Sequence, residues 1–211
     1  MRQTDKAKQV LYDFSMIVWP IWISGALFAV IHSLFASTWC KQQFYQLGMQ
    51  PQRYRLLYSI FATILTGLWV LYIYQLADSP LYEIDGWLRW LMMLVQLIGA
   101  LIALISLRSF DTKLFLGLAD APDDREPFHE HGLYRYVRHP MYTGVMLVLF
   151  ASPSQSINSF NFALIISCYF IAGSWLEERR MQHLHPHYAD YCSRVSAFIP
   201  WRTLLSRLRR S

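Results

Sequence analysis

The chain has 211 residues, of which 55% are hydrophobic and only 16% charged, and its formal net charge is +5. So few charged side chains cannot coat a soluble globule of this size, which favours a membrane protein over a soluble helical bundle. The basic residues flank apolar segments in the pattern that orients a membrane protein, so the lipid bilayer, and not nucleic acid, is the expected partner.

Three apolar runs of spanning length occupy the N-terminal half, at residues 14–36, 56–76 and 87–107. Each can cross a bilayer, because the hydrocarbon core needs about 20 helical residues. The first run is longer than the apolar core of a usual signal peptide, and no small-x-small cleavage site follows it closely. We therefore expect it to be a retained span and not a cleaved leader.

The three cysteines, Cys40, Cys168 and Cys192, have neither CxxC nor metal-ligand spacing. Their odd number and spacing indicate reduced thiols, without a disulfide framework or a zinc site. No metal is therefore expected.

The C-terminal half begins with a polar segment, residues 108–138, which predicts an ordered or semi-ordered loop. It is followed by a short apolar run at 140–151, a turn-rich stretch at 152–158 and a second apolar run at 160–176. At 1.5 Å per residue the short run reaches only about 20 Å, less than the ~30 Å hydrocarbon core. It predicts a hairpin whose first arm is short, tilted or extended back into the loop. The acidic residues of the polar segment are Asp120, Asp123, Asp124 and Glu126.

The expected fold is all-α: a polytopic integral membrane protein with about five transmembrane helices, the last two forming a helical hairpin. A single domain, 1–211, is expected, with three spans in 1–107 and the loop, hairpin and tail in 108–211. Basic residues concentrate in 37–55 and in the tail, whereas 77–86 is acidic. The positive-inside rule places the 108–138 loop and the tail in the cytoplasm. It also places the N-terminus outside, against the positive charge of its first residues.

The densest functional signal is residues 132–144, which read Gly-Leu-Tyr-Arg-Tyr-Val-Arg-His-Pro-Met-Tyr-Thr-Gly. Composition alone favours a membrane-interface anchor. Geometry favours a site, because His139 precedes a proline and is pushed toward an extended conformation at the start of a helix. The positive end of that helix attracts a carboxylate. Gly132 and Gly144 would permit close backbone approach.

A second signal is the pair Glu177 and Glu178 at the end of the last span. Successive helical residues point about 100° apart, so at most one of the two can face a pocket squarely. A solvated pair beside two arginines is the alternative, but carboxylates at membrane depth imply partners or function. The aromatic and basic residues that follow could close over a cofactor or could form a tail docked at the membrane interface. They include Tyr188, Tyr191 and the 194–200 segment.

These residues resemble the C-terminal signature of the isoprenylcysteine carboxyl methyltransferase family and its bacterial and phospholipid-methylating relatives. The resemblance covers 132–200 and includes the Arg-His-Pro motif, the hairpin, the glutamate pair, Tyr-x-x-Tyr and a final Ile-Pro. The chain departs from it at Leu184-His185, where the family usually has Phe-Gly, and this bears on the path of the tail. The resemblance implies that S-adenosylmethionine is the cofactor and is held by Tyr134, His139, Pro140, Tyr142, Glu177 and Glu178.

The N-terminal half carries a second resemblance, in residues 31–37 and 53–58. These segments resemble bacterial methyltransferases related to methanethiol S-methyltransferase and also NnrU-like membrane proteins, which include a haem-containing carotene isomerase. The resemblance implies a bacterial inner membrane location with the active site facing the cytoplasm. It also leaves an alternative in which His32 and His139 bind haem. A lone membrane histidine is more often satisfied by a neighbouring hydroxyl or carbonyl.

The expected function is methyl transfer from S-adenosylmethionine to a thiol or carboxylate acceptor that partitions into the membrane, either isoprenylcysteine-like or a small thiol. Arg138 and Glu178 are the candidate catalytic residues. Arg138 would orient an anionic acceptor or the cofactor carboxylate, and Glu178 would position the cofactor or accept a proton. The alternatives are a phospholipid amine acceptor, a haem-binding isomerase or redox protein, and a non-catalytic scaffold.

Overall fold

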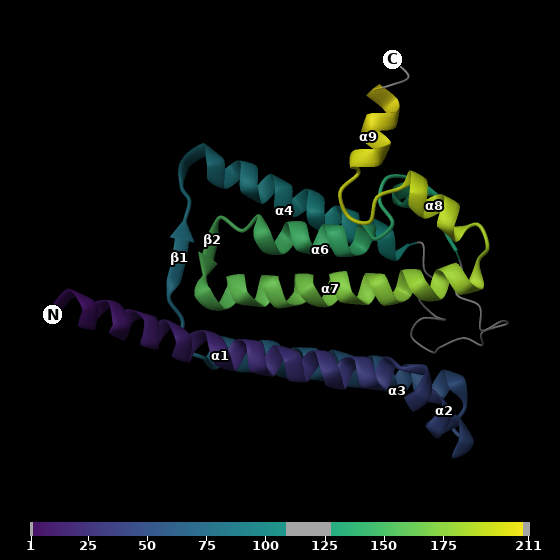
Figure 1. Ribbon diagram of the computed structural model, residues 1–211, viewed down its shortest axis with the longest axis horizontal. Helices are drawn as coiled ribbons and strands as arrows, with labels where there is room; N and C mark the ends of the chain where they lie inside the picture. Colours follow the sequence, from purple (N-terminus) through teal and green to yellow (C-terminus); the bar gives the residue numbers. More distant parts are fainter. Residues whose placement is uncertain (1, 109–127, 209–211) are drawn as a thin grey trace. The chain divides into compact units, whose positions relative to one another are not determined.

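The computed structural model describes residues 2–108 and 128–208 of the chain, and these are almost entirely helical (Figure 1). Four of their helices are long and apolar enough to cross a bilayer, which confirms a polytopic integral membrane protein. The acidic part of the predicted 108–138 loop lies outside the described residues. The elements in chain order are α1 (Arg2–Ala36), α2 (Thr38–Gln46), α3 (Pro51–Gln75), β1 (Pro80–Glu83), α4 (Gly86–Leu107), η1 (Gly132–Arg135), α6 (Pro140–Phe150), β2 (Ser154–Ser156), α7 (Ile157–Leu184), α8 (Tyr188–Arg194) and α9 (Trp201–Leu208).

The predicted hairpin is present, and its first arm is short. Helix α6 has 11 residues, which reach about 16 Å at 1.5 Å per residue. Pro140 occupies its first turn, where the missing N–H has no helical partner to lose. Helix α7 continues past the apolar run that ends at residue 176 and reaches Leu184, because neither glycine nor proline occurs between residue 176 and Pro186. Both glutamates therefore lie inside a continuous helix.

Two short strands, β1 and β2, were not predicted. They pair antiparallel, with Pro80 opposite Ser156 and Glu83 opposite Ser154. Residues 152–158 had been expected to form only a turn, and neither segment has the alternating pattern that signals a strand. Strand β1 belongs to the α3–α4 connection and β2 to the α6–α7 connection. Because the two strands are hydrogen-bonded to each other, the two connections lie on the same side of the membrane.

The described residues divide into two compact units, of which the first contains α1 to β1, β2 and the start of α7. In this unit α1 packs along α3, where Phe28 stacks on Trp69 with ring centroids 4.5 Å apart. Gly25 lets α7 approach closely, since a Cβ there would lie 2.8 Å from Ile165. Trp22 donates from Nε1 to Asn161 Oδ1 over 2.8 Å. These contacts fix the start of α7 against α1.

Asn158 caps the end of α3 within the same unit. Its Nδ2 lies 3.2 Å from the Ala77 carbonyl oxygen, 3.4 Å from that of Ile73 and 3.5 Å from that of Leu76. Its backbone N–H donates to Asp78 Oδ1 over 3.0 Å. The last carbonyls of a helix have no partner within the helix, so a side-chain donor there satisfies groups that otherwise need water.

Replacing Asn158 by alanine is therefore expected to lower the free energy of unfolding by about 1–3 kcal/mol, the cost of leaving buried acceptors without a donor. A lower thermal unfolding midpoint in detergent would show this. The control is Ser154→Ala in the same connection, where the side chain is exposed. Equal midpoints for Asn158→Ala and Ser154→Ala would contradict the capping role.

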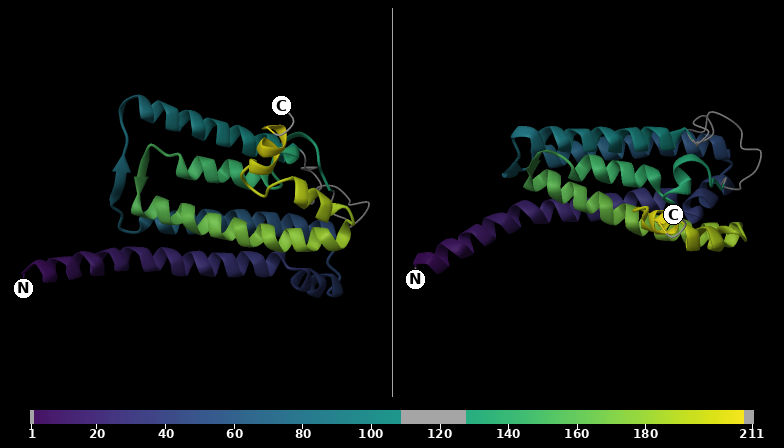
Figure 2. Two further views of the ribbon diagram at one scale, coloured as in Figure 1. Left: turned by 45° about the horizontal axis from the view of Figure 1, so that its top comes forward. Right: turned by 90° about the horizontal axis from the view of Figure 1, so that it is seen from above.

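The second unit contains α4, η1, α6, α8, α9 and the rest of α7. Within it, α6 runs along α4 and lies between α4 and α7 (Figure 2). Two glycines, Gly99 and Gly144, face each other where α4 and α6 meet. Gln96 of α4 also donates from Nε2 to the Val148 carbonyl over 2.9 Å. This unit contains every residue of the site predicted from sequence.

Candidate functional site

A pocket opens at the start of α6. Its cavity of about 80 Å³ is smaller than the ~300 Å³ of a typical small-molecule site, so the described residues enclose only part of a cofactor-sized ligand. Of the seven residues predicted from sequence, Glu178 alone is not among the lining residues. The lining comprises Phe128, His129, Tyr134, Arg138, His139, Pro140, Met141, Tyr142, Glu177, Met181, Tyr188 and Tyr191.

The tail docks on the Arg-His-Pro motif through backbone hydrogen bonds. Arg138 N donates to the Ser196 carbonyl over 2.9 Å and His139 N to the Ala197 carbonyl over 3.0 Å. His139 has φ −122° and ψ 63°, so it leaves the helical region as predicted but is not fully extended. This conformation turns its N–H away from α6 and toward the tail.

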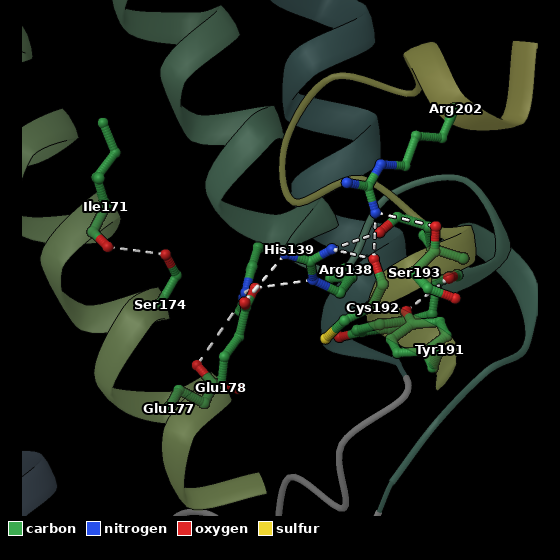
Figure 3. A network of polar contacts seen from close by, with 12 residues as sticks. Arg138, His139, Ile171, Ser174, Glu177, Glu178, Tyr191, Cys192, Ser193 and Arg202 are labelled. Atoms are coloured by element: carbon green, nitrogen blue, oxygen red, sulfur yellow. Dashed lines mark hydrogen bonds and ion pairs between the residues drawn. The ribbon is translucent and has the colours of Figure 1, made fainter. Parts of the chain in front are cut away.

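Arg138, His139 and Glu178 form a hydrogen-bonded ion network behind the pocket (Figure 3). Arg138 donates to both oxygens of Glu178, from Nε to Oε1 over 2.8 Å and from Nη2 to Oε2 over 3.0 Å. His139 Nε2 lies 2.8 Å from the same Oε1. Burial lowers the pKa of Arg138, but the hydrogen bond and charge of Glu178 outweigh burial and hold that pKa above its ordinary value. The guanidinium and the carboxylate thus neutralise each other.

The two glutamates have different environments, as their helical spacing predicts. Glu177 lines the pocket, and its Oε2 lies 3.9 Å from His139 Nδ1. The Glu177 side chain is 40% exposed, against 17% for Glu178. Glu177 is therefore the glutamate whose carboxylate lies at the pocket, whereas Glu178 is bonded to protein groups.

Aromatic rings form much of the remaining wall. Tyr142 stacks between His139, at 5.5 Å, and Phe170, at 4.4 Å. Tyr191 donates from its hydroxyl to the Tyr134 carbonyl over 2.7 Å, which ties α8 to η1. Burial, together with the charge of Glu177, raises the pKa of Tyr134 to about 12. Its hydroxyl therefore stays protonated at neutral pH and serves as a hydrogen-bond donor.

Two arginines cap the C-terminal end of α8 (Figure 3). Arg138 Nη1 donates to the carbonyls of Cys192, over 3.2 Å, and of Val195. Arg202 Nη1 donates to the Cys192 carbonyl over 2.5 Å and to the Ser193 carbonyl over 2.9 Å. Cations at a helix C-terminus satisfy its last carbonyls and complement its dipole. Arg138 thereby connects Glu178 of α7 to α8, which carries two tyrosines of the pocket.

The histidines of the haem alternative both have protein partners. Tyr58 OH lies 3.3 Å from His32 Nε2, which is the hydroxyl partner expected of a membrane histidine. His139 Nε2 is held by Glu178. Within residues 2–108 and 128–208, no group of three or more metal-binding side chains has the arrangement of a metal site.

Sequence reasoning missed five residues at this site: Phe128, His129, Met141 and Met181 in the pocket wall, and Arg202 at the end of α8. Phe128 and His129 fall in the segment predicted as a polar loop. No local pattern marks them, because they reach the pocket only when that segment packs on α8. The basic character of the tail was visible, but the helix end that Arg202 caps was not.

Comparisons with known proteins support a family assignment. A family model described as "NnrU protein" matches residues 21–151. The chain is 39% identical over 71 residues to methanethiol S-methyltransferase 1 of Bradyrhizobium diazoefficiens, covering 33% of this chain and 25% of the relative. It is 29% identical over 186 residues to methanethiol S-methyltransferase 2 of the same organism, covering 83% and 70%.

A third relative, the methanethiol S-methyltransferase of Mycobacterium tuberculosis, is 31% identical over 90 residues, covering 42% of this chain and 37% of the relative. The chain thus spans less than two thirds of the length of the first and third of these relatives. No solved structure shows a significant match to it.

Proposed function

This chain belongs to the NnrU family, and on that premise we propose that it is an integral-membrane enzyme that transfers a methyl group from S-adenosylmethionine to a thiol. The names of three similar bacterial proteins, all methanethiol S-methyltransferases, support a thiol acceptor. The observation that carries the proposal is the pocket wall, in which Glu177 stands among aromatic rings while Glu178 is neutralised behind it.

The donor set fits a sulfonium cofactor. A cation is attracted both by a carboxylate and by the faces of aromatic rings, and this wall offers Glu177 together with Tyr134, Tyr142, Tyr188 and Tyr191. S-adenosylmethionine, when bound, supplies a methyl group activated by the positive sulfur. Glu177 and the tyrosines would hold its cationic end and exclude water from it.

We assign Arg138 and Glu178 a positioning role in this reaction. Three nitrogens of Arg138 are engaged by Glu178 and by carbonyls at the end of α8. Both oxygens of Glu178 are engaged in turn by Arg138 and His139. Arg138 and Glu178 hold α8 against α7, and this keeps Tyr188 and Tyr191 in the pocket wall. In this role neither Arg138 nor Glu178 has to contact the acceptor thiol.

We further propose that the pocket opens to the cytoplasm from the bacterial inner membrane. The basic tail favours the cytoplasmic side. The pairing of β1 with β2 puts the acidic 77–86 connection and the 152–158 connection on one side. Because α6 and α7 leave the 152–158 connection toward the opposite side, we assign the Arg-His-Pro motif and the basic tail to the cytoplasmic side.

The test is calorimetric binding of S-adenosylmethionine and of its demethylated product, S-adenosylhomocysteine, to detergent-purified protein. The first ligand carries a sulfonium charge and the second does not. Glu177→Gln is therefore expected to lower the affinity for S-adenosylmethionine about tenfold, ~1.4 kcal/mol. The affinity for S-adenosylhomocysteine should fall less. Glu83→Gln, on the exposed strand β1, is the control. No binding of either ligand to folded wild-type protein would overturn the proposed function.

Activity assays on the same purified protein distinguish the candidate methyl acceptors. Turnover of a small alkyl thiol supports the proposal, whereas methylation of phosphatidylethanolamine alone would replace it with a phospholipid amine transferase. A Soret band in the purified protein would instead favour the haem alternative.

A further inference from the structure

One polar atom in the pocket wall has no hydrogen-bond partner among the residues that the structure describes. His129 lines the pocket, and its Nε2 is buried without a hydrogen bond. A buried polar nitrogen without a partner costs about 1–3 kcal/mol, so such atoms in native proteins call for an explanation. Here the atom belongs to the pocket that we propose binds the methyl donor.

The position of His129 is fixed by its neighbour. Phe128 packs its ring against Tyr188, at 5.3 Å, and Tyr191, at 5.2 Å, beside the buried Met181. The His129 ring lies 6.2 Å from that of Tyr134, which also lines the pocket. The imidazole is therefore held at the pocket by packing of the preceding residue and not by a hydrogen bond of its own Nε2.

The proposed reaction needs a proton acceptor at this place. A thiol is a weak nucleophile until it loses its proton, and methyl transfer to it releases that proton. Among the groups that face the pocket, Arg138 is a cation. Each ring nitrogen of His139 lies beside a carboxylate, Nε2 2.8 Å from Glu178 Oε1 and Nδ1 3.9 Å from Glu177 Oε2. Burial raises the pKa of Tyr134, Tyr188 and Tyr191, so these phenols stay protonated.

Glu177 is the other group of the pocket wall that could accept the thiol proton. A carboxylate is a weaker base toward a thiol than an imidazole is, and the negative charge of Glu177 has a different use beside a sulfonium. Glu130, the next residue after His129, lies with its Oε2 3.5 Å from Arg194 Nη2. Among the described imidazoles of the pocket wall, His129 Nε2 is the nitrogen that has neither a hydrogen bond nor an ion pair.

We infer that His129 is the catalytic base that takes the proton from the acceptor thiol, an assignment that rests on the proposed methyl transfer. The S–H proton moves to Nε2 and leaves the electron pair on sulfur. That pair forms the new bond between sulfur and the methyl carbon. The old bond from carbon to the sulfonium breaks, its electrons stay on the leaving sulfur, and the imidazolium returns its proton to water.

The test compares His129→Ala and His129→Gln with wild type, using ethanethiol and the more acidic thiophenol as acceptors. We expect kcat for ethanethiol to fall on the order of 10²-fold or more, the usual contribution of a general base. The loss with thiophenol should be much smaller, because that thiol ionises without help. Glutamine keeps size and hydrogen bonding but is not a base, so it should fail like alanine. His131→Ala, at an exposed histidine two residues away, is the matched control.

A second readout does not depend on turnover. With S-adenosylhomocysteine in the site at saturating concentration, the ultraviolet absorbance of bound thiophenolate should appear at lower pH in wild type than in His129→Ala. An unchanged kcat for ethanethiol, or equal losses with both thiols and the same ionisation curve, would overturn the inference. If His129 is not the base, the wild-type protein would still bind S-adenosylhomocysteine and methylate the thiol. Loss of both in wild type would instead refute the proposed function.

Discussion

Replacing Gly144 by valine is expected to prevent α4 and α6 from packing and to give the largest loss of stability among the substitutions considered. A Cβ at Gly144 would lie 2.5 Å from the Gly99 carbonyl oxygen and 2.6 Å from the Ala103 N. Both are backbone atoms of α4, so no side-chain rotation can relieve the overlap. The helices would have to separate, and since α6 begins at Pro140, the pocket would be displaced with them.

The measurement is the thermal unfolding midpoint in detergent, together with S-adenosylhomocysteine binding. Gly144→Ala should already lower both, and Gly144→Val should leave little folded protein. Gly173→Ala is the matched control, because a Cβ at Gly173 of α7 meets no atom within 4 Å. It should be neutral or stabilising by up to ~1 kcal/mol, the helix preference of alanine over glycine. Equal midpoints for Gly144→Ala and Gly173→Ala would contradict the close packing.

Removing Glu178 is expected to have the second largest effect. The Glu178 side chain is 17% exposed and that of Arg138 12%, so Glu178→Ala leaves a half-buried guanidinium without its counter-charge. Removing one partner of a buried pair typically costs about 3–5 kcal/mol. Because Arg138 also caps the end of α8, we expect the tail to loosen and cofactor affinity to fall along with the unfolding midpoint.

A double-mutant cycle isolates this pair. Glu178→Ala and Arg138→Ala should each cost nearly as much as the double variant, since each alone breaks the same network. Arg194→Ala is the control, because its ion pairs with Asp190 and Glu130 are surface contacts and its side chain is 56% exposed, a class worth about 0–1 kcal/mol. Additive losses for Arg138 and Glu178 would show that they act separately.

The sequence by itself determined the membrane spans. Apolar runs near 20 residues can be satisfied in lipid only as helices, because every backbone N–H and C=O must bond within its own segment. The three N-terminal spans and the short arm beginning at Pro140 therefore appear where they were predicted. Helix α7 extends beyond its apolar run to Leu184, since charged residues close an apolar run without ending the helix that carries them.

The sequence also selected residues of which six line one pocket, but it did not distinguish their environments. Helical geometry predicted that one of Glu177 and Glu178 at most would face a pocket, and it could not say which. The choice is made by Arg138 and His139, which occupy Glu178 from another segment of the chain. Such a network depends on side chains 40 residues apart meeting, and no local pattern encodes that.

What only the tertiary structure decided are the contacts between distant segments: the β1–β2 pair, the approach of Gly99 to Gly144, and the arrival of His129 at the pocket. Each of these contacts depends on side chains elsewhere that hold the two segments together. For example, Phe128 packs against Tyr188 of α8 and so keeps the next residue, His129, at the pocket. Residue type and spacing describe one helix at a time. Hydrogen-bond partners and close backbone approach are properties of pairs of helices, so they emerge only when the bundle is assembled.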